Sequence, residues 1–224
     1  MNRIFNVILD LGHKGGVIAL ALVLVLSVSV GMAGCSQQAD IERVLKLLPT
    51  VEGITNSIGA VVAGADPAIA MPVDAALAVI DTSFATVEGI LTTYESNLNA
   101  APQSVLDDLD AAIAAIQSNL SSIEAQIPGL SAVIILGINV GLSALQTILG
   151  FVASLLPASV AAKLFPKAFM ALSAAHVAFG VKAVIPSPRD FTKSYNARID
   201  AVGFKSNKKA HVPVPHLHVL GMPV

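Results

Sequence analysis

Three histidines near the C-terminus have the residue type and spacing to bind a metal ion. His211, His216 and His218 lie within the segment HVPVPHLHV. In an extended chain the side chains of His216 and His218 point to the same side, so two imidazoles could share a soft divalent metal, with Met222 as a weak further donor for copper. The segment supplies no carboxylate or thiolate ligand, and the alternative is a tail whose histidines bind nothing.

Other groups that could do chemistry have simpler explanations. Asp107, Asp108 and Asp110 are the densest carboxylates, and they fall in the first turn of a predicted helix, where the backbone dipole favours negative charge. His176 lies in an apolar segment and is interpreted as a core or interface residue. The chain has no G-x-S-x-G, H-E-x-x-H or phosphate-binding glycine loop. We therefore expect no catalytic residue, no enzyme activity and no cofactor.

The only cysteine, Cys35, follows a segment with the features of an export signal. Arg3 and Lys14 precede an uncharged apolar run from Val17 to Val30, and small residues then lead to the cysteine. The run is shorter than the roughly 20 residues that a stable membrane span needs. We therefore expect residues 1–34 to be removed as a signal peptide.

The four residues Met32-Ala33-Gly34-Cys35 resemble the lipobox of bacterial lipoprotein precursors, with Met32 in place of the commoner leucine. The resemblance covers about the first 36 residues and implies cleavage between Gly34 and Cys35, with covalent lipid, such as palmitate, on Cys35. Ser36 stands where the family's inner-membrane retention signal usually has Asp. This implies an outer-membrane protein that faces the periplasm, with the inner membrane as the alternative. An uncleaved helix with a buried cysteine is the competing interpretation.

The clearest helix signal lies between residues 101 and 127. Apolar residues there alternate three and four positions apart, as a heptad stripe requires. Ser104 and Asp107 resemble a capping box at the start, and Pro128 marks the end.

Two further helices precede it. A matching stripe over 73–94 predicts a helix that begins after Pro72 and packs antiparallel on its successor. A first helix over 41–62 should be kinked by Pro49, and residues 64–67 have the composition of a turn.

Residues 129–156 are 28 residues without a charge, which is long enough for a transmembrane helix. Gly137 and Gly141 form a small-xxx-small pair that could let another helix approach closely. Against a span, polar and small residues share one helical stripe, as expected for a helix of a bundle. These stripe residues are Asn139, Ser143, Gln146, Thr147, Gly150 and Ser154.

These patterns predict an all-α fold, an antiparallel helical bundle of about four to five helices over residues 35–185, after an N-terminal signal helix. The last of these helices is amphipathic and covers 158–184, with Pro166 disturbing its first turns. The prolines after Ile185 should end regular helix, so residues 186–224 are expected to form an irregular, basic tail.

Charge divides sharply along the chain. Residues 35–155 contain two basic and twelve acidic residues, whereas residues 156–224 contain nine basic and two acidic ones. Either the two halves attract each other, or the basic tail meets an anionic lipid or a protein partner. Lys205, Lys208 and Lys209 are the densest basic group for such a contact. A spanning helix at 129–156 would also separate the charges in the sense of the positive-inside rule.

The sequence therefore predicts a lipid-anchored cell-envelope protein with a structural or interaction role. Hydrophobic residues make up 54% of the chain and charged residues only 12%, which favours membrane contact. The first alternative is an integral membrane protein of pore, lysis or transport-accessory type with 129–156 in the bilayer. The second is a metal-handling lipoprotein. No nucleic-acid partner is expected, and the helical stripes also allow association between copies.

Overall fold

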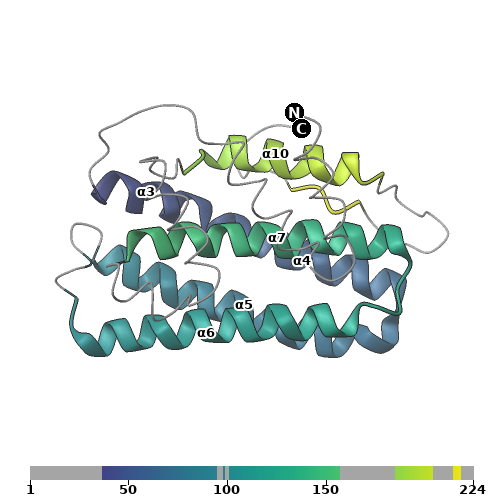
Figure 1. Ribbon diagram of the computed structural model, residues 1–224, viewed down its shortest axis with the longest axis horizontal. Coiled ribbons are helices and arrows are strands. Elements are labelled where there is room, and N and C mark those ends of the chain that lie inside the picture. The colour runs from purple at the N-terminus through teal and green to yellow at the C-terminus, as the bar shows by residue number, and fades with distance from the viewer. Residues whose placement is uncertain (1–36, 95–97, 99–100, 157–184, 204–213, 218–224) are drawn as a thin grey trace, which may run out of the picture.

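The computed structural model describes residues 37–94, 98, 101–156, 185–203 and 214–217. These residues form an all-α antiparallel bundle, shown in Figure 1, and no strand occurs among them. One hydrophobic core runs through all of the helices. The prediction of an all-α bundle is confirmed.

The predicted first helix is two helices, α3 (Gln37–Leu47) and α4 (Pro49–Ala65). They are separated at Leu48, because Pro49 has no N–H to continue the hydrogen-bond ladder and instead begins α4. The expected break at this proline is confirmed. The predicted stripe of apolar residues along this stretch is buried, namely Val44, Leu48, Val51, Ile58 and Val62.

Helix α5 (Pro67–Thr93) begins earlier than predicted. The Asp66 side chain accepts a hydrogen bond from Ala68 N at 2.9 Å, and Pro67 takes the first turn, so Asp66 both ends α4 and caps α5. Pro72, which was expected to start the helix, lies inside it and is exposed. The predicted stripe from Val73 to Leu91 is buried.

Helix α6 (Gln103–Gln126) packs along α5, as predicted. The predicted capping box is wrong, since Pro102 is the N-cap residue and no side chain caps the helix. Asp107 accepts a hydrogen bond from Gln103 Nε2 at 2.9 Å instead. Because the helix starts at Gln103, Asp107 and the carboxylates after it lie beyond its first turn, which contains no acidic residue.

Helix α7 (Ala132–Leu155) is the uncharged segment, and it packs against α3, α4 and α10. Its polar stripe is divided: Asn139 and Gln146 are half-buried, whereas Ser143 and Thr147 are buried. The Thr147 hydroxyl donates to the Ser143 carbonyl at 2.8 Å, so its polar atom is satisfied within the helix.

Gly141 explains how closely α7 approaches α4. A Cβ atom at this position would lie 2.8 Å from Cγ1 and 2.9 Å from Cδ1 of Ile58. The small residue predicted to allow close helix packing therefore does so inside the bundle.

Two helices, α5 and α7, are long and apolar enough to cross a membrane by length and composition alone. In the bundle, 56% of the most apolar window of α7 is buried, against 33% for α5. Helix α7 thus has the burial of a core helix, whereas a smaller share of α5 is buried.

The prediction that the chain is irregular after residue 185 is wrong for Pro188–Ala201, which forms α10. Ser187 caps this helix by accepting a hydrogen bond from Asp190 N at 3.2 Å, and Pro188 occupies the first turn. Helix α10 packs on α7 and buries one face, consisting of Phe191, Thr192, Tyr195 and Ile199. The bundle thus extends beyond its predicted end. The helix predicted over 158–184, with His176, lies outside the described residues.

Candidate functional site

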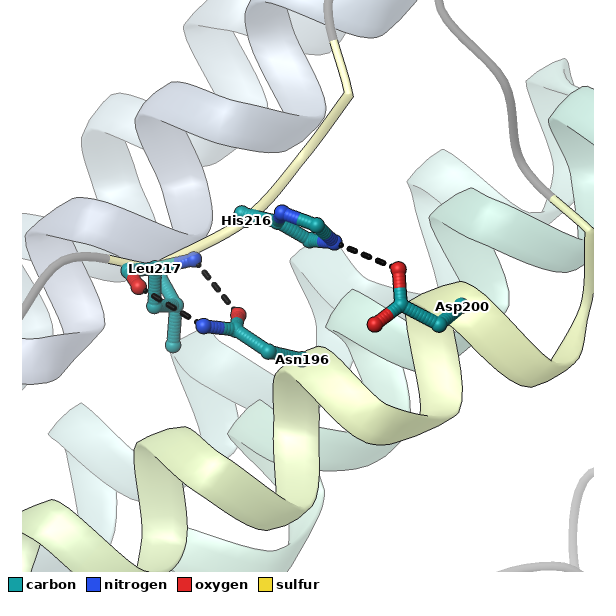
Figure 2. Close-up of polar contacts among 4 residues, drawn as sticks. All are labelled: Asn196, Asp200, His216 and Leu217. Carbon is teal, nitrogen blue, oxygen red and sulfur yellow. Dashed lines mark hydrogen bonds and ion pairs between the residues drawn. The ribbon is translucent and has the colours of Figure 1, made fainter.

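The described C-terminal segment, residues 214–217, lies against α10 and is held there by a side chain that binds its backbone. Asn196 Nδ2 donates to the Leu217 carbonyl at 2.9 Å, and the Leu217 N–H donates to Asn196 Oδ1 at 2.8 Å. Figure 2 shows the two parallel hydrogen bonds. The Asn196 amide thereby satisfies the backbone N–H and carbonyl of Leu217, in a segment that pairs with no strand among the described residues.

The ring of the neighbouring His216 contacts a carboxylate of α10. Its Nε2 atom lies 2.9 Å from Oδ1 of Asp200, one helical turn beyond Asn196 (Figure 2). The two side chains are 37% and 66% exposed. Water therefore screens the pair, and its contribution is more to orientation than to stability.

The Leu217 side chain is buried, at 5% exposure, and it reaches across to α4. A Cβ atom at Gly53 would lie 3.1 Å from Leu217 Cδ2, so the absence of a side chain at this position makes room for the leucine. Glycine inside a helix costs about 1 kcal/mol relative to alanine. Burial of Leu217 at this point offsets that cost.

The backbone of this segment turns at Pro215, which is also buried. The His216 N–H donates to the Val214 carbonyl at 2.8 Å, a hydrogen bond between residues two apart that closes a γ-turn. Proline fixes φ near the value this turn requires, so the turn is formed with little loss of chain entropy.

Two buried hydroxyl groups of α10, those of Thr192 and Tyr195, have no hydrogen-bond partner among the described residues. Burial raises the pKa of Tyr195 far above its ordinary value, which keeps the phenol neutral. A neutral phenol without a base beside it is not a nucleophile. These side chains therefore complete the core contact with α7.

A concave surface lies between α4 and α5, with a volume of about 410 Å³. Its lining combines glycine and alanine residues with polar ones that include Thr55, Asp74 and Asp81. A Cβ at Gly59 would lie 2.8 Å from Asp74 Oδ1, so this glycine lets the carboxylate approach α4.

The carboxyl group of Asp81, in this groove between α4 and α5, has a raised pKa. Burial raises its pKa, the nearby charge of Glu52 adds to the rise, and the Thr55 hydroxyl, 2.9 Å and 3.0 Å from the two carboxylate oxygens, opposes it. In the described part of the chain neither Asp74 nor Asp81 forms an ion pair. The groove therefore keeps negative charge at its surface.

The predicted metal site is only partly described. His216 is paired with Asp200, while His211 and His218 lie outside the described residues, so metal binding by the three histidines stays a prediction. Among the described residues, no group of three His, Cys, Asp or Glu side chains has the arrangement of a metal site.

The other predicted site residues are outside the described ranges. These are Gly34 and Cys35 of the lipid attachment site and Lys205, Lys208 and Lys209 of the basic tail. Helix α3 begins at Gln37, two positions after Cys35.

The residues that hold segment 214–217 were not predicted from the sequence. Asn196 is 21 positions from Leu217, and Gly53 lies on another helix, so no local pattern connects them. The cap formed by Ser187 and Pro188 was the one local signal available, because it indicates the helix that carries Asn196.

Comparisons with protein-family models, with curated proteins and with solved structures found no match to this chain.

Proposed function

We propose that this protein is a lipid-anchored component of a bacterial cell envelope with a structural or interaction role rather than a catalytic one. The observation that carries the proposal is the order of features at the N-terminus, a basic start, an apolar run, small residues and Cys35. Two or three acyl chains on one residue exceed the single chain that gives only marginal membrane binding, so the anchor would be stable.

The bundle is suited to presentation at a membrane surface. Helix α3 begins two residues beyond Cys35, so lipid on that cysteine would hold the start of α3 at the bilayer. Because α3 and α4 follow one another along the bundle, the turn at Asp66 lies at the opposite end (Figure 1).

That opposite end exposes apolar side chains, which supports an interaction role. Met71 near the start of α5 is 80% exposed, and Val133 and Leu136 near the start of α7 are 46% and 44% exposed. Both helices begin at this end because α5 and α6 are antiparallel and α7 follows α6 directly. For the proposed interaction role, the contact surface is assigned to this end of the bundle, where these three side chains are exposed.

The anchor is tested by intact-mass spectrometry and membrane fractionation of the full-length protein and of Cys35→Ala. We expect the parent to lose residues 1–34 and to gain acyl mass, and the variant to show neither change. An unprocessed and unmodified parent chain would overturn the proposal. Ser36→Asp serves as the sorting control, because it should keep the acylated protein in the inner membrane.

The alternative function, an integral membrane protein with residues 129–156 in the bilayer, is favoured by the length and hydropathy of α7. It places α6 and α10 on opposite sides of the membrane, whereas the bundle places them on the same side. Since Cys35 is the only cysteine, Ser118→Cys on α6 and Ser194→Cys on α10 each add a single labelling site, and both positions are exposed.

A maleimide that does not cross membranes separates the two functions when it is added to spheroplasts. Labelling at both positions is expected for the lipid-anchored bundle. Labelling at one position alone, with the second revealed only after detergent is added, would support the spanning protein.

A further inference from the structure

Segment 214–217 contacts the bundle as a peptide contacts a binding site rather than as one helix packs on another. One side chain binds its backbone, one apolar side chain enters a space left by a glycine, and one imidazole ring meets a carboxylate. These three contacts come from α10 and α4, and the binding residues are Gly53, Asn196 and Asp200.

We propose that this surface of α4 and α10 is a docking site for a peptide of a second protein that carries proline, a cationic residue and leucine in succession, and that Pro215-His216-Leu217 occupies it as a competing internal ligand. The proposal concerns a surface that the lipid anchor does not use. It holds whether or not Cys35 is acylated, so the two proposals can fail separately.

The geometry assigns one preference to each position of the peptide. The leucine position must have an N–H, because the Leu217 N–H donates to Asn196 Oδ1 at 2.8 Å. Its side chain must reach the space above Gly53, where the nearest Leu217 carbon would lie 3.1 Å from an added Cβ.

The two preceding positions set the charge and the shape. A cation at the position of His216 is complemented by Asp200, whose carboxylate lies 2.9 Å from the imidazole nitrogen. A proline at the position of Pro215 fixes the γ-turn in advance, which reduces the entropy lost on binding.

The chain's own segment has an advantage over any external peptide. Because it belongs to the same molecule, it is present at an effective concentration that is of the order of millimolar for a short connection. A partner peptide must displace it, so binding should be weak until the internal segment is disabled.

The test uses the full-length chain in detergent micelles and a fluorescent peptide with the sequence of residues 212–219, VPVPHLHV. Leu217→Asp disables the internal segment, since a charged side chain cannot enter the apolar space above Gly53. We expect fluorescence anisotropy to show at least tenfold tighter binding to Leu217→Asp than to the parent.

Two double variants locate the binding. Asn196→Ala added to Leu217→Asp should weaken peptide binding at least tenfold, because both backbone hydrogen bonds are lost. Lys193→Ala, an exposed substitution on the same helix, is the matched control and should leave the affinity unchanged. A peptide with leucine replaced by aspartate should not bind.

Equal affinity of the parent and Leu217→Asp, or binding that survives Asn196→Ala, would overturn the proposal. Circular dichroism checks that the variants keep the parent helix content. If Leu217→Asp does not fold, Leu217→Ala replaces it, and a tenfold loss of hydrogen-exchange protection at the residue 217 amide is expected together with a gain of peptide binding. Loss of protection without peptide binding would show that the contact is only structural.

Discussion

Gly141→Ala should destabilise the bundle, although alanine is the better helix former. The added Cβ would lie 2.8 Å and 2.9 Å from two carbons of Ile58, a residue that is 2% exposed and packed in the core. Overpacking of this kind costs about 1–3 kcal/mol, and the higher helix propensity of alanine offsets about 1 kcal/mol of it. The expected net loss of unfolding free energy is therefore up to about 2 kcal/mol.

Gly150→Ala on the same helix is the matched control. No atom lies within 4 Å of its added Cβ, so only the propensity gain of about 1 kcal/mol applies. In urea unfolding followed by circular dichroism, Gly150→Ala should have a higher free energy of unfolding than the parent. Gly141→Ala should have a lower one, or one equal to that of the parent.

A double-mutant cycle with Ile58→Ala then tests the contact itself. Removing the two crowded carbons should make Gly141→Ala no longer destabilising, with a coupling energy of about 1 kcal/mol or more. If Gly141→Ala is as stable as Gly150→Ala, α7 does not pack on α4 in this way, and the reasoning that places α7 in a bundle core is refuted.

Three further changes test other parts of the structure. Burial raises the pKa of Asp81 above its ordinary value of 3.8, so the folded state holds this proton more tightly than the unfolded state. The stability that this proton contributes is therefore lost as the pH rises from the ordinary pKa through the raised one. Asp81→Asn should remove that fall and, because solvent screens a half-buried carboxylate, should stabilise the protein at pH 7 by less than about 1 kcal/mol in urea unfolding. Ser187→Ala removes the cap on Asp190 N and should cost about 0.5–2 kcal/mol, measured as faster hydrogen exchange in α10 alone. Pro72→Ala restores a helical N–H on an exposed face of α5 and should raise the melting temperature, and no rise would mean that α5 is bent there for another reason.

The helices that were predicted correctly are those whose burial follows from local spacing. In α6 the residues from Leu109 to Ile127 that were assigned to the stripe are all buried, because a three-four alternation places them on one face whatever that face meets. The break at Pro49 was equally local, since it follows from the missing N–H of one residue.

The boundaries that were wrong depended on more than spacing. Asp66 and Pro67 were interpreted as a turn, yet the same two residues also cap and start α5, so the helix is longer than its apolar stripe. Helix α10 has a polar sequence with only a narrow apolar face, and its packing on α7 is needed to reveal that face as buried.

The residues of the proposed docking site could not be predicted from the sequence either, because their contacts join parts of the chain that are far apart. His216 attracted attention for its chemistry as a metal ligand, but its described partner is Asp200, a carboxylate 16 positions earlier on a helix that had not been predicted. Gly53 lies inside α4 with no local reason for a glycine, and the position of Leu217 explains it.

The charge division of the chain is not used to hold its described parts together. Arg43 pairs with Asp40 and His216 with Asp200, each within its own half of the sequence. No described cation pairs with a carboxylate of α5 or α6, although these helices are packed in the same bundle as α10. Most of the charge on the two halves is therefore not compensated by ion pairs among the described residues. An uncompensated acidic surface on α5 and α6 repels anionic groups and attracts basic ones.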